Sequence, residues 1–586
     1  MVEKPQFRSS ANAAWLRALE RTSRIGERPT LTLPVLVAET AAERPDAPAL
    51  ISDGESLSYG ELAARADRYA AWSRASGLEA GSVVGLMMSN RPEYVAIWLG
   101  LTRVGVTVAL LNTNLRGAAL AHCITAAGAR TLIVEAAFAG SFDEVPAGLW
   151  LHGKAALDRP RIDLWIAEAA MLGDRLPPQA TLDTRALYIY TSGNTGLPKA
   201  ASISHHRIMQ WAGWFAGMAD LKPSDRTYNC LPLYHSVGGV VAVGAALVAG
   251  GSVFLREKFS ARQFWREVTA RECTIFQYIG ELARYLLSAP PDPAETQHKL
   301  RLACGNGLRA DVWEAFQTRF AIPQILEFYA ATEGNFSLFN AEGQPGAIGR
   351  FPNFLPHRKG VALVKVDPAT GVPDRGEDGF CVRCGTDESG ETISLISGGA
   401  AARFEGYADS AATERKVLRN VFQTGDAWFR SGDLMRKDAH GFFYFVDRIG
   451  DTFRWKGENV ATAEVAAVVR ACPGVADADV YGVAVPGTDG KAGMVAIVPG
   501  EGFDIADLHA HVAARLPAYA RPLFVRLCKD LARTATFKAN TQGLQADGFD
   551  PAVVADPLFF DAPGAGCFVP LDAALHVDLT AGRVKI

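Results

Sequence analysis

The chain lacks an excess of charge of either sign. Its 59 lysine and arginine residues stand against 63 aspartate and glutamate residues, which leaves a formal net charge of −4 over 586 residues. Proteins that bind nucleic acids carry a basic patch or stripe that meets the phosphate backbone, and the sequence offers none. We therefore expect no nucleic-acid partner.

Cysteine is scarce and irregularly spaced. The nine cysteines are odd in number and scattered, unlike the paired framework of a small secreted protein. Cys381 and Cys384 form a lone C-x-x-C pair with no second pair and no nearby histidine. Two thiols in or beside a strand explain this pair better than a zinc or redox site does.

Long apolar runs are also rare, and one stretch is long enough to be considered as a membrane span. Residues 1–28 are polar and charged, without the apolar segment of a secretory signal. Residues 236–255 carry no charge, and twenty such residues nominally match the length of a membrane span. Because this stretch contains five glycines, we expect a buried helix, a glycine turn and the start of a buried strand instead. We predict a cytoplasmic protein; peripheral contact with the cytoplasmic face of a membrane, and a homodimer, stay open.

The pattern of apolar residues indicates an α/β fold. Ser58 to Glu61 form a capping box ahead of a helical pattern. Strand-like runs at 83–88, 107–111 and 131–134 then alternate with helix-like segments such as 92–101. This alternation predicts layered α/β subdomains with largely parallel sheets.

The chain is too long for one core, so two or more domains are expected. Glycine and aspartate crowd together in residues 433–459, a composition that suits a hairpin and a hinge. We therefore place a boundary after Ile449, with a large N-terminal domain at 1–449 and a smaller, mobile C-terminal α/β domain at 450–586.

A polar, glycine-rich segment follows the strand-like run Ala186–Tyr190. It ends at a lysine after a Leu-Pro pair, so its spacing is not that of a Walker loop. Inward-turned backbone N–H groups and hydroxyls could wrap phosphate oxygens there, although an ordinary turn explains the pattern as well. The residues concerned are Thr191, Ser192, Gly193, Asn194, Thr195, Gly196 and Lys199.

Polar residues also follow two later strand-like runs. After Ile325-Leu326 come Tyr329, which could stack on a base, Thr332, which could donate to a phosphate, and Glu333, which could ligate Mg²⁺. Residues 305–307, Gly-Asn-Gly, allow the close approach of a flat ring.

Three further candidates come from other parts of the chain. Asp433 and Arg448 could hold ribose hydroxyls as acceptor and donor, and Lys538 is a late lysine in a polar stretch. Taken singly, each has an ordinary explanation as a loop carboxylate, a turn residue or a surface charge. His235 is likewise more often a histidine with satisfied hydrogen bonds than a catalytic one.

Taken together and in order, these segments resemble the adenylate-forming superfamily of acyl-CoA synthetases, luciferases and peptide-synthetase adenylation domains. Within it, the chain most resembles the fatty acid transport protein / very-long-chain acyl-CoA synthetase family. The general motifs are residues 190–199, 329–334 and 431–434, and the narrower ones are residues 276–282, 305–309, 451–460, 481–486 and the tail from 556 to 571.

The resemblance implies an ATP-dependent, AMP-forming ligase that makes an acyl-adenylate and then a CoA ester. ATP, Mg²⁺ and CoA are the implied cofactors and co-substrates. The implied catalytic set is Lys538, Glu333, Thr332 and His235, and the implied magnesium ligands are Thr195 and Glu333. The implied nucleotide- and CoA-binding residues are Thr191, Ser192, Gly193, Asn194, Thr195, Gly196, Lys199, Gly305, Asn306, Gly307, Tyr329, Ala330, Thr332, Asp433, Arg448, Lys456 and Gly457.

Three positions depart from the usual family pattern. Asn194 replaces the more usual threonine of the phosphate loop but keeps a donor. Ala535 stands where glycine is expected, close to Lys538. Gly450 falls where many members carry a hinge aspartate or lysine, which fits a flexible pivot.

The resemblance points to long-chain or very-long-chain fatty acids as substrates, with residues 276–280 lining part of the acyl pocket and Trp211, Trp214 and Phe215 as weaker candidates. These aromatic residues are just as readily core residues. Bulky steroid or bile-type acids are an alternative substrate class. A fatty acid uptake or acyl-binding protein with little turnover, and an adenylation domain that loads a carrier protein, are the competing functions.

Overall fold

The computed structural model describes residues 10–142, 144–168, 178–191, 198–355, 360–367, 370–397, 403–449, 452–455, 458–486, 488, 490–533, 541–584 and 586. Its packing separates two compact units. The first unit comprises Met1–Arg358 and Leu395–Leu418, and the second comprises Lys359–Ser394 and Arg419–Ile586. The boundary after Ile449 stays a prediction.

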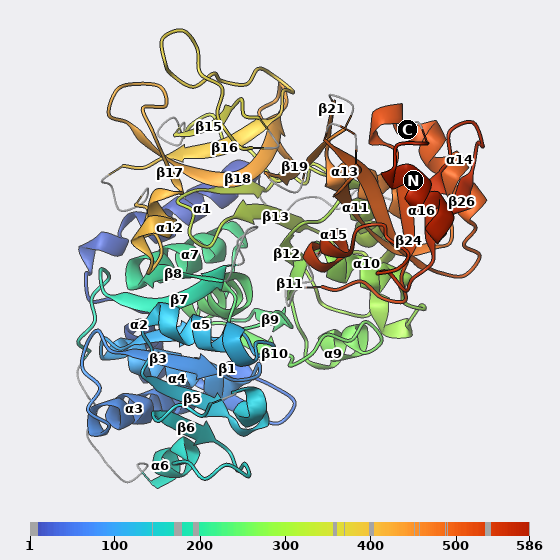
Figure 1. Ribbon diagram of the computed structural model, residues 1–586. Helices are drawn as coiled ribbons and strands as arrows, with labels where there is room; N and C mark the ends of the chain where they lie inside the picture. Colours follow the sequence, from blue (N-terminus) through green and yellow to red (C-terminus); the bar gives the residue numbers. More distant parts are fainter. Residues whose placement is uncertain are drawn as a thin grey trace. The chain divides into compact units, whose positions relative to one another are not determined.

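Two large sheets form the centre of the first unit (Figure 1). The eight-stranded sheet has the order β14-β13-β12-β11-β9-β10-β1-β2, and the six-stranded sheet has the order β6-β5-β3-β4-β7-β8. Neighbouring strands run parallel except at the edges, where β2, β14 and β8 pair antiparallel. The predicted parallel α/β architecture is confirmed for both sheets.

The strands of these two sheets have the following bounds: β1 Pro48–Ile51, β2 Ser56–Ser58, β3 Val83–Met87, β4 Thr107–Leu110, β5 Thr131–Glu135, β6 Leu149–His152, β7 Arg185–Thr191, β8 Lys199–Ser204, β9 Arg226–Asn229, β10 Ser252–Leu255, β11 Ile275–Ile279, β12 Leu302–Asn306, β13 Ile325–Ala330 and β14 Ser337–Asn340.

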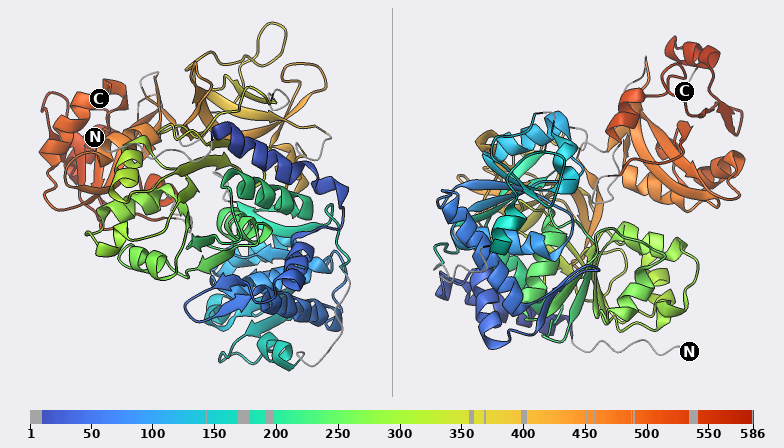
Figure 2. Two further views of the ribbon diagram at one scale, coloured as in Figure 1. Left: turned by 180° about the vertical axis from the view of Figure 1, so that it is seen from behind. Right: turned by 90° about the horizontal axis from the view of Figure 1, so that it is seen from below.

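The helices of the first unit are α1 Ala11–Ser23, α2 Leu33–Glu43, α3 Tyr59–Ala75, α4 Pro92–Arg103, α5 Gly117–Ala127, α6 Ile162–Glu168, α7 His205–Met218, α8 Val243–Val248, α9 Phe264–Ala270, α10 Gly280–Ser288, α11 Ala310–Arg319 and α12 Ser410–Glu414. Helix α1 lies along α7 (Figure 2, left). Trp15 of α1 meets Trp214 of α7 edge to face, with 5.8 Å between ring centroids.

The capping box predicted ahead of the first strand–helix alternation is present. The Ser58 side chain accepts from the Glu61 backbone, and the Glu61 carboxylate accepts from the Ser58 backbone, so two otherwise unpaired N–H groups at the start of α3 are satisfied. The predicted inward face of this helix is buried against the core; it consists of Leu62, Ala66, Tyr69 and Trp72.

The charge-free stretch at 236–255 folds as the sequence predicts. It forms a π-helix at Ser236–Ala242, then α8, a turn in which Gly250 has φ of +70°, and the fully buried strand β10. A turn of that hand favours glycine because it has no Cβ. In the described part of the chain, no helix is both long and apolar enough to cross a bilayer.

The second unit contains mostly antiparallel strands. One five-stranded sheet has the order β15-β16-β18-β17, with β19 paired to β18, and the C-terminal sheet has the order β22-β23-β24-β25-β26. Along the chain, the short hairpin of β20 Phe453–Trp455 and β21 Glu458–Val460 comes between the two sheets. The other bounds are β15 Val361–Val364, β16 Gly390–Leu395, β17 Val417–Arg419, β18 Ala427–Lys437, β19 Phe443–Arg448, β22 Val475–Ala484, β23 Lys491–Pro499, β24 Phe524–Leu527, β25 Leu558–Asp561 and β26 Phe568–Pro570.

The described residues of the C-terminal part also form helices α13 Thr462–Arg470, α14 Ile505–Arg515, α15 Gln542–Asp547 and α16 Ala573–Thr580. Together with the sheet they enclose a core of their own, which includes Tyr481, Met494, Phe524 and Phe560. The predicted smaller α/β domain is thus present; its described strands form a mixed sheet in which β23 and β24 pair in parallel and the other neighbours pair antiparallel.

Candidate active site

The ends of β12 and β13 bring two of the predicted nucleotide-binding segments together. The strands are parallel neighbours in which Gly305 pairs with Glu327, so residues 306–307 and 329–330 lie at the C-terminal ends of the two strands, at the same edge of the sheet. Within the described chain, the Asn306 Oδ1 atom is buried and has no hydrogen-bond partner. A buried acceptor of this kind is a ready partner for a ligand donor such as an exocyclic amine.

Packing against Tyr278 requires glycine at position 305. A Cβ on Gly305 would lie 2.5 Å from the Tyr278 ring, closer than side chains tolerate. Gly307 has φ of +82°, a conformation that glycine adopts without strain. Both glycines therefore shape the edge at which Tyr329 emerges, half-buried, with its ring centroid 5.6 Å from that of Phe336.

The buried carboxylate of Glu327 supports this edge of the sheet through hydrogen bonds. Glu327 accepts a hydrogen bond from the Leu308 backbone at 3.0 Å and one from the Tyr278 hydroxyl. Burial raises the pKa of Glu327 to about 8, and the hydrogen bonds from Tyr278, Leu308 and Gly307 offset only part of that rise. Glu327 thus joins β11, β13 and the 305–308 turn in one polar network.

Thr332 contacts the segment that contains His235. The hydroxyls of Thr332 and Ser236 lie 3.0 Å apart, within hydrogen-bonding distance. Ser236 begins the π-helix, His235 is its N-cap residue, and the His235 ring packs 4.7 Å from Tyr234, centroid to centroid. Single-turn π-helical stretches are frequent at functional sites, and this one places His235 and Thr332 in the same neighbourhood.

Glu333 has a cation and a hydroxyl as partners. Its Oε1 atom accepts a 2.8 Å hydrogen bond from Tyr407 and lies 3.6 Å from the Lys416 ammonium. The Glu333 side chain is 10% exposed and that of Lys416 is 24% exposed, so this ion pair is largely screened from water.

A second cation supports the same turn. Arg207 of α7 is buried, donates to the Gly334 carbonyl and stacks over Trp211, with its guanidinium carbon 4.9 Å from the ring centroid. Burial lowers the pKa of Arg207, while Glu405 and Glu333 raise it. The turn that presents Thr332 and Glu333 is therefore held to α7 through its backbone.

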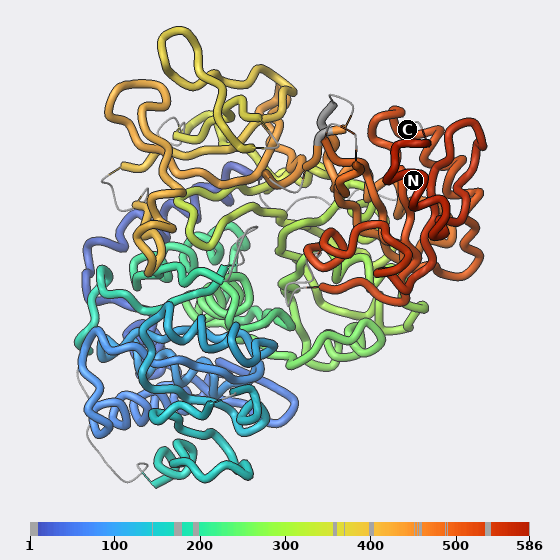
Figure 3. Tube along the Cα trace, viewed as in Figure 1, coloured from blue at the N-terminus to red at the C-terminus, as the bar shows by residue number. Residues whose placement is uncertain are grey.

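Lys199 lies beside Tyr407 at the beginning of β8. It pairs with Thr191 in the β7–β8 ladder, and its ammonium is 5.8 Å from the Tyr407 ring centroid. Tyr407 reaches this position because it bridges Ala201, and Ala408 donates to the Ala200 carbonyl. In Figure 3, the backbone of the segment that contains Tyr407 and Ala408 can be traced to β8.

Several residues predicted to bind phosphate lie between β7 and β8, outside the described residues. They are Ser192, Gly193, Asn194, Thr195 and Gly196. Also outside the described residues are Gly450, Lys456, Gly457, Ala535 and Lys538.

The predicted ribose pair lies in the second unit. Asp433 and Arg448 face each other across the antiparallel pair β18–β19, with 3.5 Å between Asp433 Oδ1 and Arg448 Nε. Next to them, the Asp447 carboxylate accepts from the backbone and hydroxyl of Thr462 at the start of α13.

The aromatic residues considered for the acyl pocket belong mainly to the core. Trp214 and Phe215 pack against Phe339, and Phe215 also packs against Phe328. Phe276 is fully buried in an aromatic cluster with Phe264, at 4.5 Å between centroids. The core explanation that the sequence left open for the helical pair thus fits their contacts.

The C-x-x-C pair consists of two cysteines that form no disulfide. Cys381 and Cys384 are free thiols, and no three or more histidine, cysteine or acidic side chains converge as a metal cage in the described part of the molecule. Magnesium often takes one or two carboxylates together with substrate phosphates instead of a protein cage. The lone Glu333 carboxylate fits that mode of binding.

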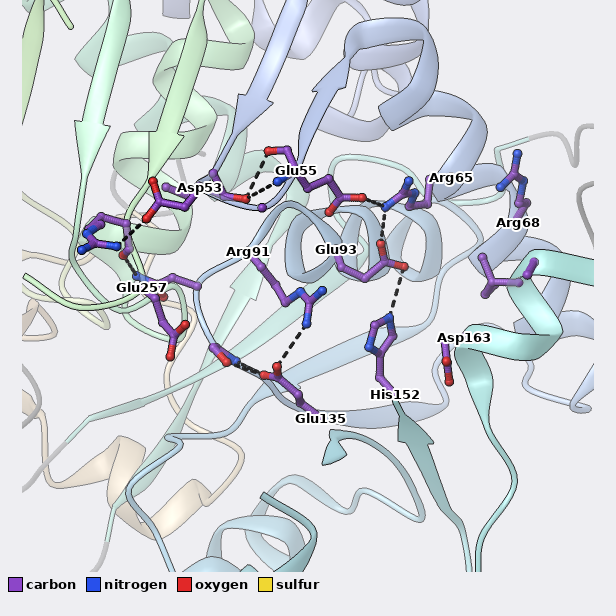
Figure 4. A pocket seen from close by; sticks show the side chains of 18 residues that line it. Asp53, Glu55, Arg65, Arg68, Arg91, Glu93, Glu135, His152, Asp163 and Glu257 are labelled. Atoms are coloured by element: carbon purple, nitrogen blue, oxygen red, sulfur yellow. Dashed lines mark hydrogen bonds and ion pairs between the residues drawn. The ribbon is translucent and has the colours of Figure 1, made fainter. Parts of the chain in front are cut away.

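A separate charged pocket of about 570 Å³ lies where β1, β3, β5, β6 and β10 end. In Figure 4, Arg65 lies between Glu55 and Glu93, with His152 on the other side of Glu93. Asn90 in its wall donates to the Leu231 carbonyl and accepts from the Leu233 backbone, which ties the pocket to the chain just before His235. Most of its charged groups neutralise one another.

Sequence reasoning missed Glu327, Arg207, Tyr407 and Lys416. The first had a signal, because a carboxylate inside the run Ile-Leu-Glu-Phe-Tyr must find partners when the strand is buried. The others reach the site from distant segments, and no local pattern marks them.

Comparisons with known proteins identify the family of this chain. A family model described as AMP-binding enzyme matches residues 37–382, and one described as AMP-binding enzyme C-terminal domain matches residues 464–538. Long-chain fatty acid transport protein 1 of Mus musculus is 40% identical, covering 97% of this chain and 90% of that protein. The chain belongs to the fatty acid transport protein family of adenylate-forming enzymes. Long-chain fatty acid transport protein 3 of Homo sapiens is 41% identical, over 87% of this chain and 76% of its own length.

Solved ligases share the fold of this family member. The anthranilate CoA ligase AuaEII in complex with anthranoyl-AMP aligns with a TM-score of 0.75 at 20% identity, covering 89% of this chain and 98% of that one. ATP-bound MatB from Rhodopseudomonas palustris aligns with a TM-score of 0.72 at 24% identity, covering 88% and 99%. These two structures show the fold, and the family match above shows that the protein is of the adenylate-forming, acyl-CoA ligase type.

Proposed function

We propose that this protein is an ATP-dependent, AMP-forming acid–CoA ligase that activates long-chain or very-long-chain fatty acids. The identity of 40% to a long-chain fatty acid transport protein along 97% of the chain carries the proposal. The retention of Thr332, Glu333, Asp433, Arg448 and Lys538 supports turnover, because a protein that only binds acids has no need of that set.

In the proposed first half-reaction, a carboxylate oxygen attacks the α-phosphorus of ATP and pyrophosphate leaves. Tyr329 and residues 305–307 receive the adenine, where the unpaired Asn306 Oδ1 supplies an acceptor. Thr332 contacts the α-phosphate, and residues 191–199 hold the β- and γ-phosphates. A magnesium ion held by Glu333, with Thr195, neutralises phosphate charge when bound.

Two anions meet at the reaction centre, so a cation between them lowers the barrier. We assign this role to Lys538, and we assign the ribose hydroxyls to Asp433 and Arg448. His235 stays a catalytic candidate because its neighbour Ser236 contacts Thr332.

In the proposed second half-reaction, the CoA thiol attacks the acyl carbonyl and AMP leaves. The C-terminal domain turns about a pivot near Gly450, which brings residues 451–460 to the site, and Lys456 and Gly457 then contact CoA. We further propose a cytoplasmic location with peripheral membrane contact. Vesicle flotation tests the membrane contact, and size-exclusion chromatography tests whether the protein forms a homodimer, which the sequence leaves open.

Release of AMP from a panel of acids, with and without CoA, tests the proposed reaction. We expect AMP and acyl-CoA in equal amounts with long-chain or very-long-chain fatty acids. A preference for steroid-type acids would favour the alternative substrate class. Dependence on a carrier protein, or the absence of AMP with every acid, would overturn the proposal.

A further inference from the structure

Tyr407 links two parts of the candidate site that lie far apart in the sequence. Its hydroxyl donates to Glu333 Oε1 at 2.8 Å, and the Thr191 side chain is a second hydrogen-bond partner of Tyr407. The Tyr407 ring also lies beside Lys199, with 5.8 Å between the ammonium and the ring centroid. Tyr407 therefore joins the carboxylate that is proposed to hold magnesium to both strands that flank the proposed phosphate segment.

The backbone around Tyr407 fixes the position of this side chain. Tyr407 forms an antiparallel bridge with Ala201 of β8, and the Gly406 carbonyl accepts from the Ser202 backbone at 3.0 Å. The Tyr407 N–H group donates to the Thr413 hydroxyl at 3.0 Å. Because the side chain is buried and its backbone is paired, the fold sets the direction of the hydroxyl.

The two carboxylate oxygens of Glu333 differ in their surroundings. Oε1 accepts the hydrogen bond from Tyr407, and Lys416 also approaches this oxygen, at 3.6 Å. No residue in the described part of the chain donates a hydrogen bond to Oε2. Carboxylates that ligate metals are themselves held by such outer hydrogen bonds, which orient the ligand. Glu333 thus has one oxygen that the fold anchors and one that is left for a ligand.

We propose that Tyr407 is a positioning residue for the magnesium site: its hydroxyl anchors Glu333 Oε1 and leaves Oε2 to bind the ion that accompanies ATP. The inference rests on the proposed function, since it assigns a further residue to the same ATP site. Tyr407 acts through Glu333 and not by contact with the nucleotide. Loss of its hydroxyl should therefore weaken the metal-dependent part of nucleotide binding and spare the rest.

Calorimetry on the full-length protein, without fatty acid, measures that part directly. ATP is titrated with Mg²⁺ in excess and again with EDTA in place of Mg²⁺, and AMP is titrated with EDTA. The ratio of the two ATP affinities is the contribution of the metal. For Tyr407→Phe, which removes only the hydroxyl, we expect this ratio to fall about tenfold, as for other hydrogen-bond partners of metal ligands. The AMP affinity should stay unchanged.

Tyr228→Phe is the matched control. The Tyr228 hydroxyl donates at 2.7 Å to Glu267, a carboxylate with no proposed role in binding, so this variant also loses one tyrosine–glutamate hydrogen bond but should keep the wild-type ratio. Glu333→Gln retains an oxygen acceptor for Tyr407 but loses the charge that binds Mg²⁺. In that background, Tyr407→Phe should lower the ratio no further. If the phenylalanine variant does not fold, Tyr407→Met fills the buried position without a hydroxyl.

A loss of ATP affinity that requires both Mg²⁺ and Glu333 supports the inference. Equal losses with Mg²⁺ and with EDTA would show that Tyr407 only shapes the pocket, and a further loss in the Glu333→Gln background would show that it acts elsewhere. Either result overturns the inference, as does an unchanged ratio. If the wild-type protein binds ATP equally well in both buffers, the inference fails while the ligase proposal stands. If it binds no nucleotide, the ligase proposal fails as well.

Discussion

Glu327 offers a direct test of how burial controls a carboxylate beneath the candidate site. The residue is 1% exposed, and burial raises the pKa of its carboxyl to about 8, against an ordinary value of 4.5. Replacing it by glutamine keeps an acceptor for the Leu308 backbone but removes the titration. We expect this variant to lose less stability than the wild-type protein as the pH rises.

The direction of this pH dependence of stability follows from which state, folded or unfolded, binds the Glu327 proton. Between pH 4.5 and about 8 the folded protein keeps the Glu327 proton, whereas the unfolded chain has released it. The contribution of Glu327 to stability is therefore complete below pH 4.5 and is lost as the pH rises through 8. Each pH unit in this window is worth at most about 1.4 kcal/mol, so the change from pH 5.5 to 7.5 is roughly 2–3 kcal/mol.

Thermal melting at several pH values, at one scan rate, measures the effect. A change of this size shifts the midpoint of a large domain by a few degrees, and that shift should be smaller in Glu327→Gln. Tyr278→Phe is the control, since it removes a hydrogen bond that lowers the pKa of Glu327 and should move the loss of stability to higher pH. Equal losses in the wild-type and glutamine proteins between pH 5.5 and 7.5 would refute the reasoning.

Three further changes probe other parts of the chain. Gly305→Ala brings a Cβ to 2.5 Å from the Tyr278 ring and should weaken ATP binding and lower the melting temperature; normal values for both would contradict the packing. Burial raises the pKa of Glu93, but hydrogen bonds from His152 and Tyr69 and the Arg65 charge lower it to about 2, so its contribution is present above pH 4.5 and lost as the pH falls toward 2. Arg65→Ala should cost roughly 3 kcal/mol at neutral pH and move acid unfolding to higher pH, as followed by circular dichroism; an unchanged acid midpoint would count against it. Lys538→Ala should abolish ATP–pyrophosphate exchange with less effect on thioester formation from preformed acyl-adenylate, and unchanged exchange would remove Lys538 from its proposed role.

Local structure could be predicted from the sequence because local rules decide it. The capping box at Ser58 and Glu61 satisfies backbone donors three residues apart, whatever surrounds it. The run at 236–255 was readable as helix, turn and strand because glycines interrupt its apolar residues. The placement of Asn306 and Tyr329 near the ends of their strands could be predicted in part, because polar residues follow strand-like runs in the sequence.

The partners of the predicted site residues depended on the tertiary structure. Glu333 stood out in the sequence, yet Tyr407 and Lys416 reach it only because the segment 405–408 bonds to β8. Arg207 supports Gly334 from 127 residues away. Charges and hydroxyls at such separations carry no periodic signal, so packing alone brings them together. The sequence by itself determined which groups can carry the chemistry; the fold decided which cations and hydroxyls surround the carboxylate, because long-range strand pairing sets those distances.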